Sequence, residues 1–447
     1  MKTDAGATRD ALAETDVLVI GGGPGGSTAA IRLTELGHRV TLLEKARHPR
    51  FHIGESLLPA NLPLLRELGV LEQVKLIGMQ KWGAEFYSKW HGRGETFEFA
   101  ESWDKSLQFA YHVRRSEFDE ILIRRAAAVG ATVIEGCRVR DVEPAADGGT
   151  TLVRAEHEDG RTQCWRATYV IDASGRDTLL GNKLNAKRRN ARHSSAAMFA
   201  HFKGAQRYPE TRRAGLITIY WFEHGWIWFI PFSDDISSVG AVVWPYYLKS
   251  RKTDLSEFLD ATIRMCPHLA ERLAHAERVT EVEATGNYSY ECTLSHGERF
   301  LMVGDAYAFV DPMFSSGVML AMNSAMEGAR VADICLREPA RAAQALNGYH
   351  RLMKQGLKDY SWFISRTTGP TMRNLFMAPR NLFRMKEAIL SLLAGDIFGK
   401  SPIGPSLLAF KVLFYLSALL TPRQSLAALR QRAINIAPAD SGRMTTG

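Results

Sequence analysis

Residues 17–27 read VLVIGGGPGGS: a short β-branched run, a glycine-rich turn, and the start of a helix-compatible stretch that continues to Leu36. Gly21, Gly23 and Gly26 fall in the G-x-G-x-x-G spacing. In that spacing the first glycine permits a tight turn, the second lets the backbone approach a pyrophosphate, and the third lets the helix pack on the strand. The stretch therefore predicts a strand, turn and helix that bind a dinucleotide.

A second predicted strand supports this interpretation. Residues 39–43 (RVTLL) form a β-prone run that ends in Glu44, about 20 residues after the turn, where a ribose-binding carboxylate is expected. The amino end of the preceding helix offers free amide groups and the positive end of its dipole to the phosphates. A mere glycine turn would explain neither the second strand nor the acid.

The rest of the chain divides into parts that differ in residue composition. Two more strands run into turns, 166–171 into Asp172 and 299–303 into Gly304-Asp305, and a small-residue helix is predicted from about Gly317 to Leu336. Between these strands, residues 195–290 are rich in β-branched and aromatic residues, which is typical of an antiparallel sheet. The sequence thus predicts an α/β protein whose Rossmann-like nucleotide-binding domain is interrupted by an antiparallel β-sheet domain and followed by a helical C-terminal region.

Composition and charge exclude several classes of protein. The hydrophobic fraction of 46% and the charged fraction of 23% are those of a folded globular chain and exclude a disordered or collagen-like one. The five cysteines are scattered and never spaced C-x-x-C, which predicts neither a metal site nor a disulfide framework. The N-terminal stretch has no apolar signal region, so we expect a cytoplasmic protein.

The net charge of +8 is concentrated at one end. Residues 341–447 hold 15 lysines and arginines against 4 acidic residues, and the remaining chain is close to neutral. No interleaved arginine and aromatic pattern indicates nucleic-acid binding, whereas an acidic protein or an anionic membrane suits such a surface. The apolar run 407–420 is too short to span a bilayer. We expect a buried helix that covers the sheet domain, with a membrane-surface or partner-docking helix as the alternative.

Four separated motifs resemble the flavin-dependent halogenases, a branch of the aromatic-hydroxylase-like flavoproteins. They are the glycine turn with Glu44, the segment GESLLP (54–59), the segment WIWFIP (226–231), and the segment FVDPMFSSG (309–317). These match the family patterns GES-x-x-P, W-x-W-x-I-P and F-x-x-P-x-x-S-x-G in the right order. The resemblance spans most of residues 15–335.

The resemblance implies a cofactor, a halide site and a domain division. FAD, used as FADH2, is expected in contact with seven residues of these motifs and with an aspartate and an arginine outside them: Gly21, Gly23, Gly26, Glu44, Ser56, Pro312, Gly317, Asp305 and Arg115. The main chain at Ser316 and Gly317 is expected to bind chloride or bromide, and Trp226, Trp228 and Phe314 to separate the flavin from the substrate. The FAD-binding domain would comprise 15–190 and 298–340, the β-sheet substrate domain 191–297, and the basic helical region 341–447.

Lys81 aligns with the active-site lysine of the resembled family. An amine there can hydrogen-bond hypohalous acid or form a haloamine, and either delivers an electrophilic halogen to one ring position. Phe314 stands where the tryptophan halogenases have a catalytic glutamate, so the resemblance implies a phenol or pyrrole substrate, free or on an acyl carrier protein, rather than an indole. The sequence does not identify the proton acceptor; His52, His112 and His201 are candidates.

Each residue also has an ordinary structural interpretation. The tryptophans could be sheet core, Lys81 and Arg115 could be solvated surface residues, Asp305 could be a helix N-cap, and Ser316 and Gly317 could be only a helix start. Two further functions stay open: a flavin hydroxylase or reductase of the same fold, and an inactive flavin-binding docking subunit. One dinucleotide fingerprint is visible, so we expect a separate flavin reductase to supply FADH2, and neither a metal nor a nucleic acid is expected.

Overall fold

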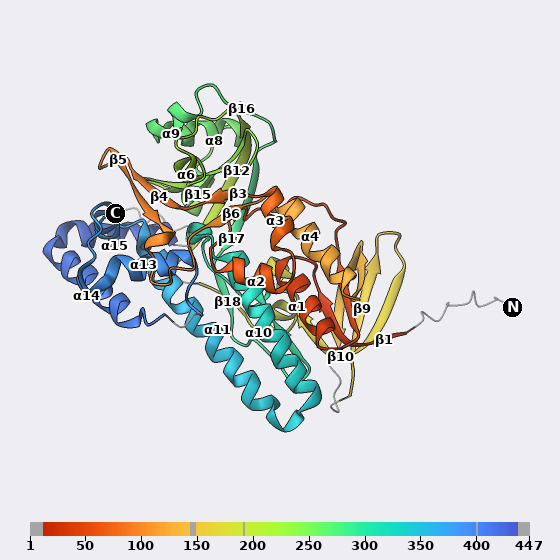
Figure 1. Cartoon of the computed structure of the whole chain (residues 1–447). Coiled ribbons are helices and arrows are strands. Elements are labelled where there is room, and N and C mark those ends of the chain that lie inside the picture. The colour runs from red at the N-terminus through yellow and green to blue at the C-terminus, as the bar shows by residue number, and fades with distance from the viewer. Residues whose placement is uncertain (1–11, 144–148, 191–192, 399–400, 437–447) are drawn as a thin grey trace, which may run out of the picture.

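The computed structural model describes residues 12–143, 149–190, 193–398 and 401–436 (Figure 1). A seven-stranded sheet runs in the order β7 (Thr132–Glu135), β2 (Val40–Glu44), β1 (Ala13–Ile20), β10 (Thr162–Asp172), β9 (Thr151–His157) and β8 (Cys137–Glu143), with β19 (Phe300–Met302) also paired to β10. The pairs among β7, β2, β1, β10 and β19 are parallel. The carboxyl ends of β1, β2 and β10 therefore meet at one edge, where ligands bind in open α/β sheets.

Helices cover this sheet because its strands are apolar on both faces. Helix α1 (Pro24–Glu35) follows the glycine turn and contacts both α4 (Arg115–Ala128) and α10 (Gly317–Arg337). All but three residues of α1 are buried, and its small side chains allow this close packing. Helix α10 begins at the glycine predicted to start it and extends to Arg337.

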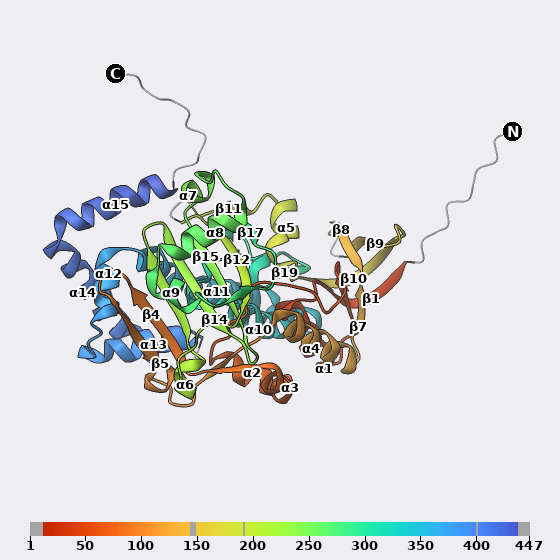
Figure 2. The same ribbon diagram turned by 90° about the horizontal axis from the view of Figure 1, so that it is seen from above.

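A second, eight-stranded sheet lies between the first sheet and the C-terminal helices (Figure 2). Its order is β16 (Glu277–Arg278), β12 (Ser195–Lys203), β15 (Ile236–Val243), β14 (Gly225–Pro231), β13 (Ile217–Phe222), β4 (Gly83–Ser88) and β5 (Arg93–Glu98), with β17 (Glu283–Tyr288) also paired to β12. The strands between residues 195 and 288 pair antiparallel, as expected. Two strands come from residues 83–98, however, and β4 pairs parallel to β13, which the sequence analysis did not anticipate.

One face of this second sheet carries its own core. Alternate residues such as Ile227 and Phe229 pack with α8 (Leu255–Arg264) and α9 (Pro267–Arg272). The other alternate residues, Trp226, Trp228 and Ile230, face the main core of the protein. This two-residue alternation is the geometry of a strand buried on both faces.

Smaller elements lie in the connections within and between the two sheets. They include α2 (Asn61–Glu67), α3 (Leu71–Ile77), α5 (Leu179–Lys183), α6 (Thr211–Ala214), α7 (Pro245–Lys249), the paired strands β3 (Met79–Lys81) and β6 (Ala110–His112), and the sheet of β11 (Lys187–Arg189), β18 (Tyr290–Cys292) and β20 (Ala308–Phe309). Strand β3 leads directly to β4, so the chain enters the second sheet at residues 81–83.

The C-terminal region is helical, as expected. It comprises α11 (Pro339–Thr367), α12 (Pro370–Met377), α13 (Met385–Ala394), α14 (Gly404–Leu420) and α15 (Pro422–Ile436). Helix α12 contacts β4 and β5, and α13 contacts the 3-10 turn Phe99–Glu101. Helices α12 to α15 gather at one end of the molecule, opposite β1 and β9, whereas α11 packs along α10 (Figures 1 and 2).

The prediction that residues 407–420 form a buried helix is wrong for most of its surface. In α14 only Ser406, Leu407 and Phe410 are buried. Among the described residues no single helix is long and apolar enough to cross a membrane, although α14 and the first part of α15, bent by 106°, reach that length and composition together. The apolar side chains on the outer face of α14 are exposed because no described element covers them.

Candidate active site

A cavity of about 760 Å³ lies at the carboxyl edge of the first sheet and extends to the second sheet. Its walls come from segments far apart in the sequence, among them the glycine turn, the GES segment and the FVDP segment. Of the predicted site residues, those that line it are Gly21, Gly23, Glu44, Ser56, Arg115, Trp226, Trp228, Asp305, Pro312 and Gly317. Gly26, Lys81, Phe314 and Ser316 are not among its lining residues.

The glycine turn has the predicted geometry. Gly21 has a φ of +100°, and a Cβ there would overlap the carbonyl oxygen of Ala173. A Cβ at Gly26 would overlap the carbonyl oxygen of Gly21, so this position holds the helix against the turn. Gly23 faces the cavity, with only Arg50 Nη2 near its missing Cβ, at 3.7 Å. The second glycine therefore leaves its backbone open to a phosphate.

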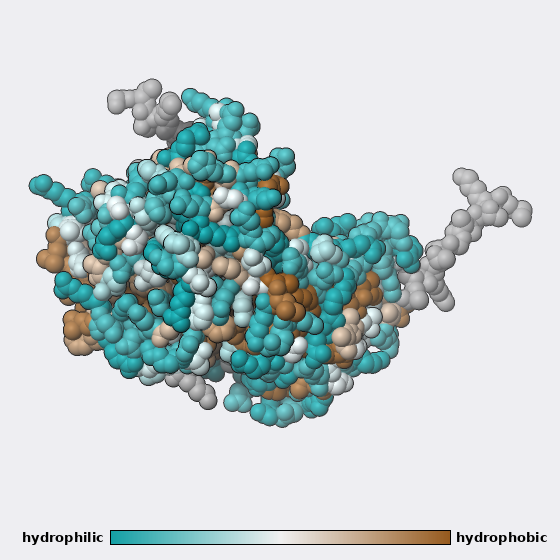
Figure 3. Space-filling view, turned by 45° about the horizontal axis from the view of Figure 1, so that its top comes forward, coloured by the Kyte–Doolittle hydropathy of each residue, from teal (hydrophilic) through white to brown (hydrophobic). Residues whose placement is uncertain are grey.

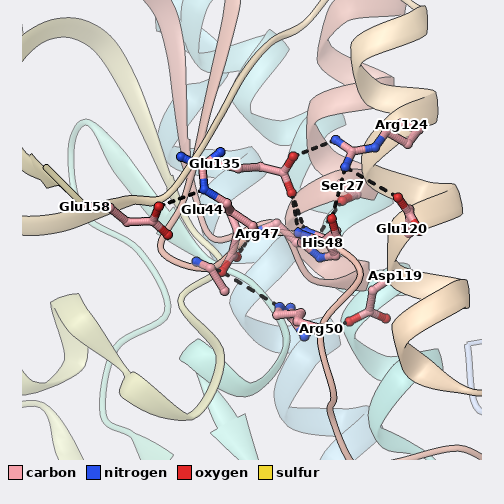
Figure 4. Close-up of polar contacts among 12 residues, drawn as sticks. Ser27, Glu44, Arg47, His48, Arg50, Asp119, Glu120, Arg124, Glu135 and Glu158 are labelled. Atoms are coloured by element: carbon pink, nitrogen blue, oxygen red, sulfur yellow. Dashed lines mark hydrogen bonds and ion pairs between the residues drawn. The ribbon is translucent and has the colours of Figure 1, made fainter.

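Glu44 and Arg50 form the polar end of the cavity (Figure 4). The Glu44 carboxylate accepts hydrogen bonds from the amides of Gly22, at 2.6 Å, and Ala46, at 2.9 Å. Arg50 lies 3.9 Å from that carboxylate and 3.2 Å from the carboxylate of Asp119. The amides fix Glu44 at the end of β2, and its oxygens retain lone pairs that a ribose hydroxyl can use.

Arg115 is buried, which excludes the interpretation as a solvated arginine. Its guanidinium donates to both oxygens of Asp119, at 2.7 and 2.9 Å, and to the carbonyl of Ile53 at 3.0 Å. Burial alone would raise the pKa of Asp119, but the charge and hydrogen bonds of Arg115, together with Arg50, hold it below its usual value. A fixed, charged arginine thus lies at the cavity wall, and guanidinium groups are good hydrogen-bond donors to phosphates.

Asp305 follows β19 and Gly304 and lies in the cavity wall. Burial raises its pKa to about 6, against the lowering effects of Arg176 and then Arg115. The residue that precedes this short 3-10 turn is Val303, and no side chain caps it, so Asp305 is not an N-cap. A carboxyl group at this place can accept hydrogen bonds from a polyol such as a ribityl chain, or donate one to it when protonated.

Trp226 and Trp228 line the cavity from β14 and are almost fully buried. Trp228 Nε1 donates to Ser238 Oγ at 3.1 Å. Gly240 on the neighbouring strand lies under the Trp228 ring, and a Cβ there would overlap it. The sequence analysis missed this glycine, although a lone glycine inside a β-branched run is a recognised sign of a close approach. Phe314 packs instead against Tyr360 of α11, with ring centroids 6.2 Å apart.

The loop 311–317 brings the predicted halide residues to the cavity. Ser315 adopts a left-handed conformation (φ 56°) and lines the cavity together with Gly317, whereas the side chain of Ser316 is buried. Asp311 anchors the loop: its Oδ2 lies 2.9 Å from His193 Nε2 and accepts from Ser195 Oγ at 2.9 Å. Neither His193 nor Asp311 was singled out from the sequence, because the pair joins residues 118 positions apart.

Lys81 is buried, which excludes a solvated surface lysine. Its amine donates to Ser56 Oγ at 2.9 Å and to the carbonyl of Leu57 at 3.1 Å, and it lies 5.2 Å from the centroid of the Phe99 ring. Ser56 in turn lines the cavity. Burial lowers the pKa of Lys81 to about 7. The amine can therefore exchange protons near neutral pH, and only Ser56 lies between it and the cavity.

The three histidine candidates have different surroundings. His52 lines the cavity, and burial, followed by the charge of Arg115, lowers its pKa to about 4. His112 lies on β6 beside β3, and its Nε2 is 3.0 Å from the carbonyl of Gly215, so that nitrogen carries the proton. Burial and the charge of Lys81 hold the pKa of His112 well below its usual value. His112 is thus a neutral base whose Nδ1 has no partner among the described side chains.

His201 pairs with Glu55 of the GES segment, and the sequence did not reveal this pair. His201 Nε2 lies 2.8 Å from Glu55 Oε1, and Glu55 lines the cavity while being almost fully buried. Phe51 packs against the His201 ring, at 6.0 Å between centroids. A sequence separation of 146 residues leaves no local pattern for such a contact.

The groups that line the cavity suit an extended dinucleotide that carries a fused ring system. They include an open glycine turn, the Glu44 carboxylate, arginines, the Asp305 carboxyl group, two tryptophans and a glycine-bearing loop. Within the described residues no group of three or more histidine, cysteine or acidic side chains could hold a metal ion.

Comparison with known proteins agrees with this geometry. The sequence model of the FAD binding domain matches residues 14–353. A 1H-pyrrole-2-carbonyl-[peptidyl-carrier protein] chlorinase of Pseudomonas fluorescens is 32% identical over 410 residues, which cover 86% of this chain and 89% of that protein. The chain belongs to the flavin-dependent halogenases. It is therefore an FAD-dependent oxidoreductase that uses halide.

Two other halogenases illustrate the breadth of the family. A tryptophan 2-halogenase of Chondromyces crocatus is 34% identical over 342 residues, covering 75% of this chain and 64% of that longer protein. The solved structure of the myxobacterial chondrochloren halogenase superposes with a TM-score of 0.75 at 33% identity, covering 88% of this chain and 92% of that one. The expected fold, cofactor and enzyme class are thereby confirmed.

Proposed function

We propose that this flavin-dependent halogenase acts on an electron-rich ring of the phenol or pyrrole type presented on a carrier protein, and that Lys81 guides the hypohalous acid to it. The observation that carries the proposal is the contact of the Lys81 amine with Ser56, a residue of the cavity wall. The amine is buried, its hydrogen-bond partners fix its position, and its pKa is close to neutrality. Such an amine can hydrogen-bond the oxidant or exchange a proton for halogen.

FAD supplies the chemistry that activates oxygen toward halide when it is bound. For this chain we assign contacts to Gly21, Gly23 and Glu44 at the nucleotide end, with Gly26 closing the turn behind them. Arg115 would serve the diphosphate, Asp305 the ribityl chain, and Ser56, Pro312 and Gly317 the ring end. Halide would lie at the amides of the Ser316–Gly317 segment, whose place in the loop is fixed by Asp311.

The tryptophans would exclude water and substrate from the flavin end of the cavity. Trp226 and Trp228 form a continuous apolar surface held by Ser238 and Gly240. Phe314, buried against Tyr360, would extend this wall on the side of α11. A wall of this kind leaves a small oxidant as the species able to pass between the two sites.

The substrate class rests on two observations. Phe314 supplies no carboxylate where the tryptophan halogenases have one, and one relative is named for a pyrrole bound to a carrier protein. The tryptophan 2-halogenase relative widens the set of electron-rich rings that the test must include. The positive field of residues 341–447 would steer an acidic carrier to the enzyme.

The partner assignment follows from the single dinucleotide fingerprint. We propose that a separate reductase delivers FADH2, and a cytoplasmic location remains a prediction. The test is an incubation of the enzyme with a reductase, FAD, oxygen, chloride or bromide, and matched free and carrier-bound phenols, pyrroles and indoles, with the products identified by mass spectrometry. Halogenation of the carrier-bound phenol or pyrrole in preference to its free analogue supports the proposal. Equal turnover of both forms, or halogenation of indole alone, overturns it.

The role of Lys81 can be tested separately from the identity of the substrate, with a variant of the lysine. Lys81→Ala should abolish the halogenated product while FAD binding and oxygen consumption persist, because the amine lies outside the flavin cavity. Lys75→Ala, at an exposed lysine paired with Glu72, is the matched control. A Lys81→Ala enzyme that halogenates at the wild-type rate would remove Lys81 from the mechanism.

A further inference from the structure

An apolar ridge runs along the outer face of α14. We define it as Leu408, Val412, Leu416, Leu419 and Leu420, all of which are exposed. The two residues at its end protrude furthest, with 74% of Leu419 and 84% of Leu420 exposed. Figure 3 shows hydrophobic surface at the edge of the molecule where Figure 1 places this helix. Clustered aliphatic side chains in water are costly unless a partner covers them.

The ridge is a fixed surface because side chains on the opposite face and on one flank of α14 are anchored. Phe410 stacks on Phe363 of α11, with centroids 5.5 Å apart. Lys411 donates to Asp359 at 2.7 Å. Arg366 of α11 and the Trp362 indole both donate to Tyr415 Oη. These contacts leave the helix no freedom to turn its leucines inward.

The charge around the ridge has one sign. Residues 397–439 contain no aspartate or glutamate. Arg423 and Arg430 on α15 are exposed and have no ion-pair partner among the described residues. Leu426, also exposed, lies between them on the same helix. Aliphatic side chains flanked by free arginines are typical of helices that lie in a membrane interface.

We propose that the elbow of α14 and α15 docks the enzyme on an anionic lipid bilayer, with the ridge inserted among the acyl chains and Arg423 and Arg430 on the headgroup phosphates. The two helices bend by 106°, which places Leu419 and Leu420 at the tip of the elbow. Helix α14, with 17 residues, is too short to span the hydrocarbon core. The contact is therefore interfacial. It is independent of the proposed substrate and of Lys81.

Two protein partners fit less well. Leucine and valine are under-represented among the residues that dominate protein interfaces, whereas a lipid surface selects for them. A second copy docked through the same ridge would bring additional arginines with no acidic residue in either helix to neutralise them. An acidic carrier would match the arginines but would leave the protruding leucines of the elbow unexplained.

The test is flotation of the FAD-loaded enzyme with two kinds of vesicle: phosphatidylcholine alone, and phosphatidylcholine with phosphatidylglycerol. We expect binding to the anionic vesicles and little to the neutral ones. Leu419→Ser with Leu420→Ser should reduce the partition coefficient on the order of tenfold or more, because two buried leucines are lost. Arg423→Glu should reduce it several-fold and should weaken its salt dependence. Flavin absorbance confirms that each variant is folded and loaded.

Leu76→Ser is the matched control, because Leu76 on α3 is 86% exposed but lies outside the ridge. This variant should float like the wild type. Absence of flotation with anionic vesicles, or an equal loss in the ridge variant and the control, overturns the proposal. Two other results would also overturn the proposal, because they would give the ridge another partner. One is a concentration-dependent dimer, seen by sedimentation, that the ridge variant alone abolishes. The other is binding of a carrier protein that the ridge variant abolishes while flotation is unchanged.

Discussion

The protonation of Lys81 should be measurable as a pH-dependent contribution to stability. The pKa of this buried amine falls from 10.5 to about 7, while the unfolded chain keeps the ordinary value. Between these values the unfolded state binds more protons, so the free energy of unfolding rises with pH from about 7 to 10.5. The full displacement corresponds to about 5 kcal/mol, at 1.36 kcal/mol per pH unit. This penalty is fully present below pH 7.

Lys81→Met removes the amine and keeps the length of the side chain. It also removes the donor to Ser56 Oγ and to the Leu57 carbonyl. The Ser56 hydroxyl lines the cavity and can find another partner there, whereas the carbonyl is left unsatisfied at a cost of about 1–3 kcal/mol. The variant should therefore be more stable than the wild type by about 2–4 kcal/mol at pH 6.5, and this advantage should shrink by about 1.4 kcal/mol for each pH unit above 7. The lost hydrogen bonds change the offset but not the slope.

Urea unfolding of the FAD-loaded enzyme at several values of pH between 6 and 10 provides the assay, with tryptophan fluorescence as the signal. Lys75→Met, at an exposed lysine in α3, is the control and should retain the pH dependence of the wild type. If Lys81→Met and the wild type show parallel curves over the whole range, the amine is not held in a water-excluded site. The amine would then not exchange protons near neutral pH, and the proposed role of Lys81 would be wrong.

Flavin binding, the anchored loop 311–317 and the source of FADH2 can each be tested. Gly26→Ala should yield protein without FAD, because its Cβ would overlap a carbonyl of the turn. The control Gly348→Ala has open space at its Cβ and should purify with a normal flavin spectrum. Equal flavin content in the two variants would show that Gly26 is not needed for the packing of the turn. His193→Gln should raise the KM for halide several-fold with little change in FAD affinity, because it loosens the anchor of the loop 311–317; a change in kcat alone would contradict this role. Stopped-flow mixing of the FAD-loaded enzyme with NADPH should leave the flavin absorbance unchanged until a reductase is added, and rapid bleaching without one would contradict the assignment of a separate reductase.

The parts of the site that could be predicted from the sequence are local. The glycine turn, Glu44 at the end of β2 and the start of α10 at Gly317 each follow from the residues beside them. A strand followed by a glycine turn places its next polar residue at the sheet edge, which is where Asp305 lies. The alternation of Trp226 and Trp228 predicted a shared face, and both line the cavity.

The parts that could not be predicted depend on pairing between distant segments. Strands β4 and β5 join the second sheet because β4 pairs parallel to β13, more than 120 residues later. Nothing in residues 83–98 specifies that partner. The same holds for the pairs of Glu55 with His201 and Asp311 with His193. In each pair nothing in the sequence marks the acidic residue as the partner of a histidine, and only the fold brings the histidine into contact with it.

The apolar run 407–420 shows a second reason why burial could not be predicted from the sequence. A run that is hydrophobic on every side has no amphipathic period, so the pattern cannot indicate which face packs inward. The fold selects that face through Phe410, whose ring stacks on Phe363, and through Lys411, which pairs with Asp359. The opposite face is then left with leucines that have no covering element. Burial of a helix is thus decided by what the rest of the chain can place over it, and here the described chain covers only one side.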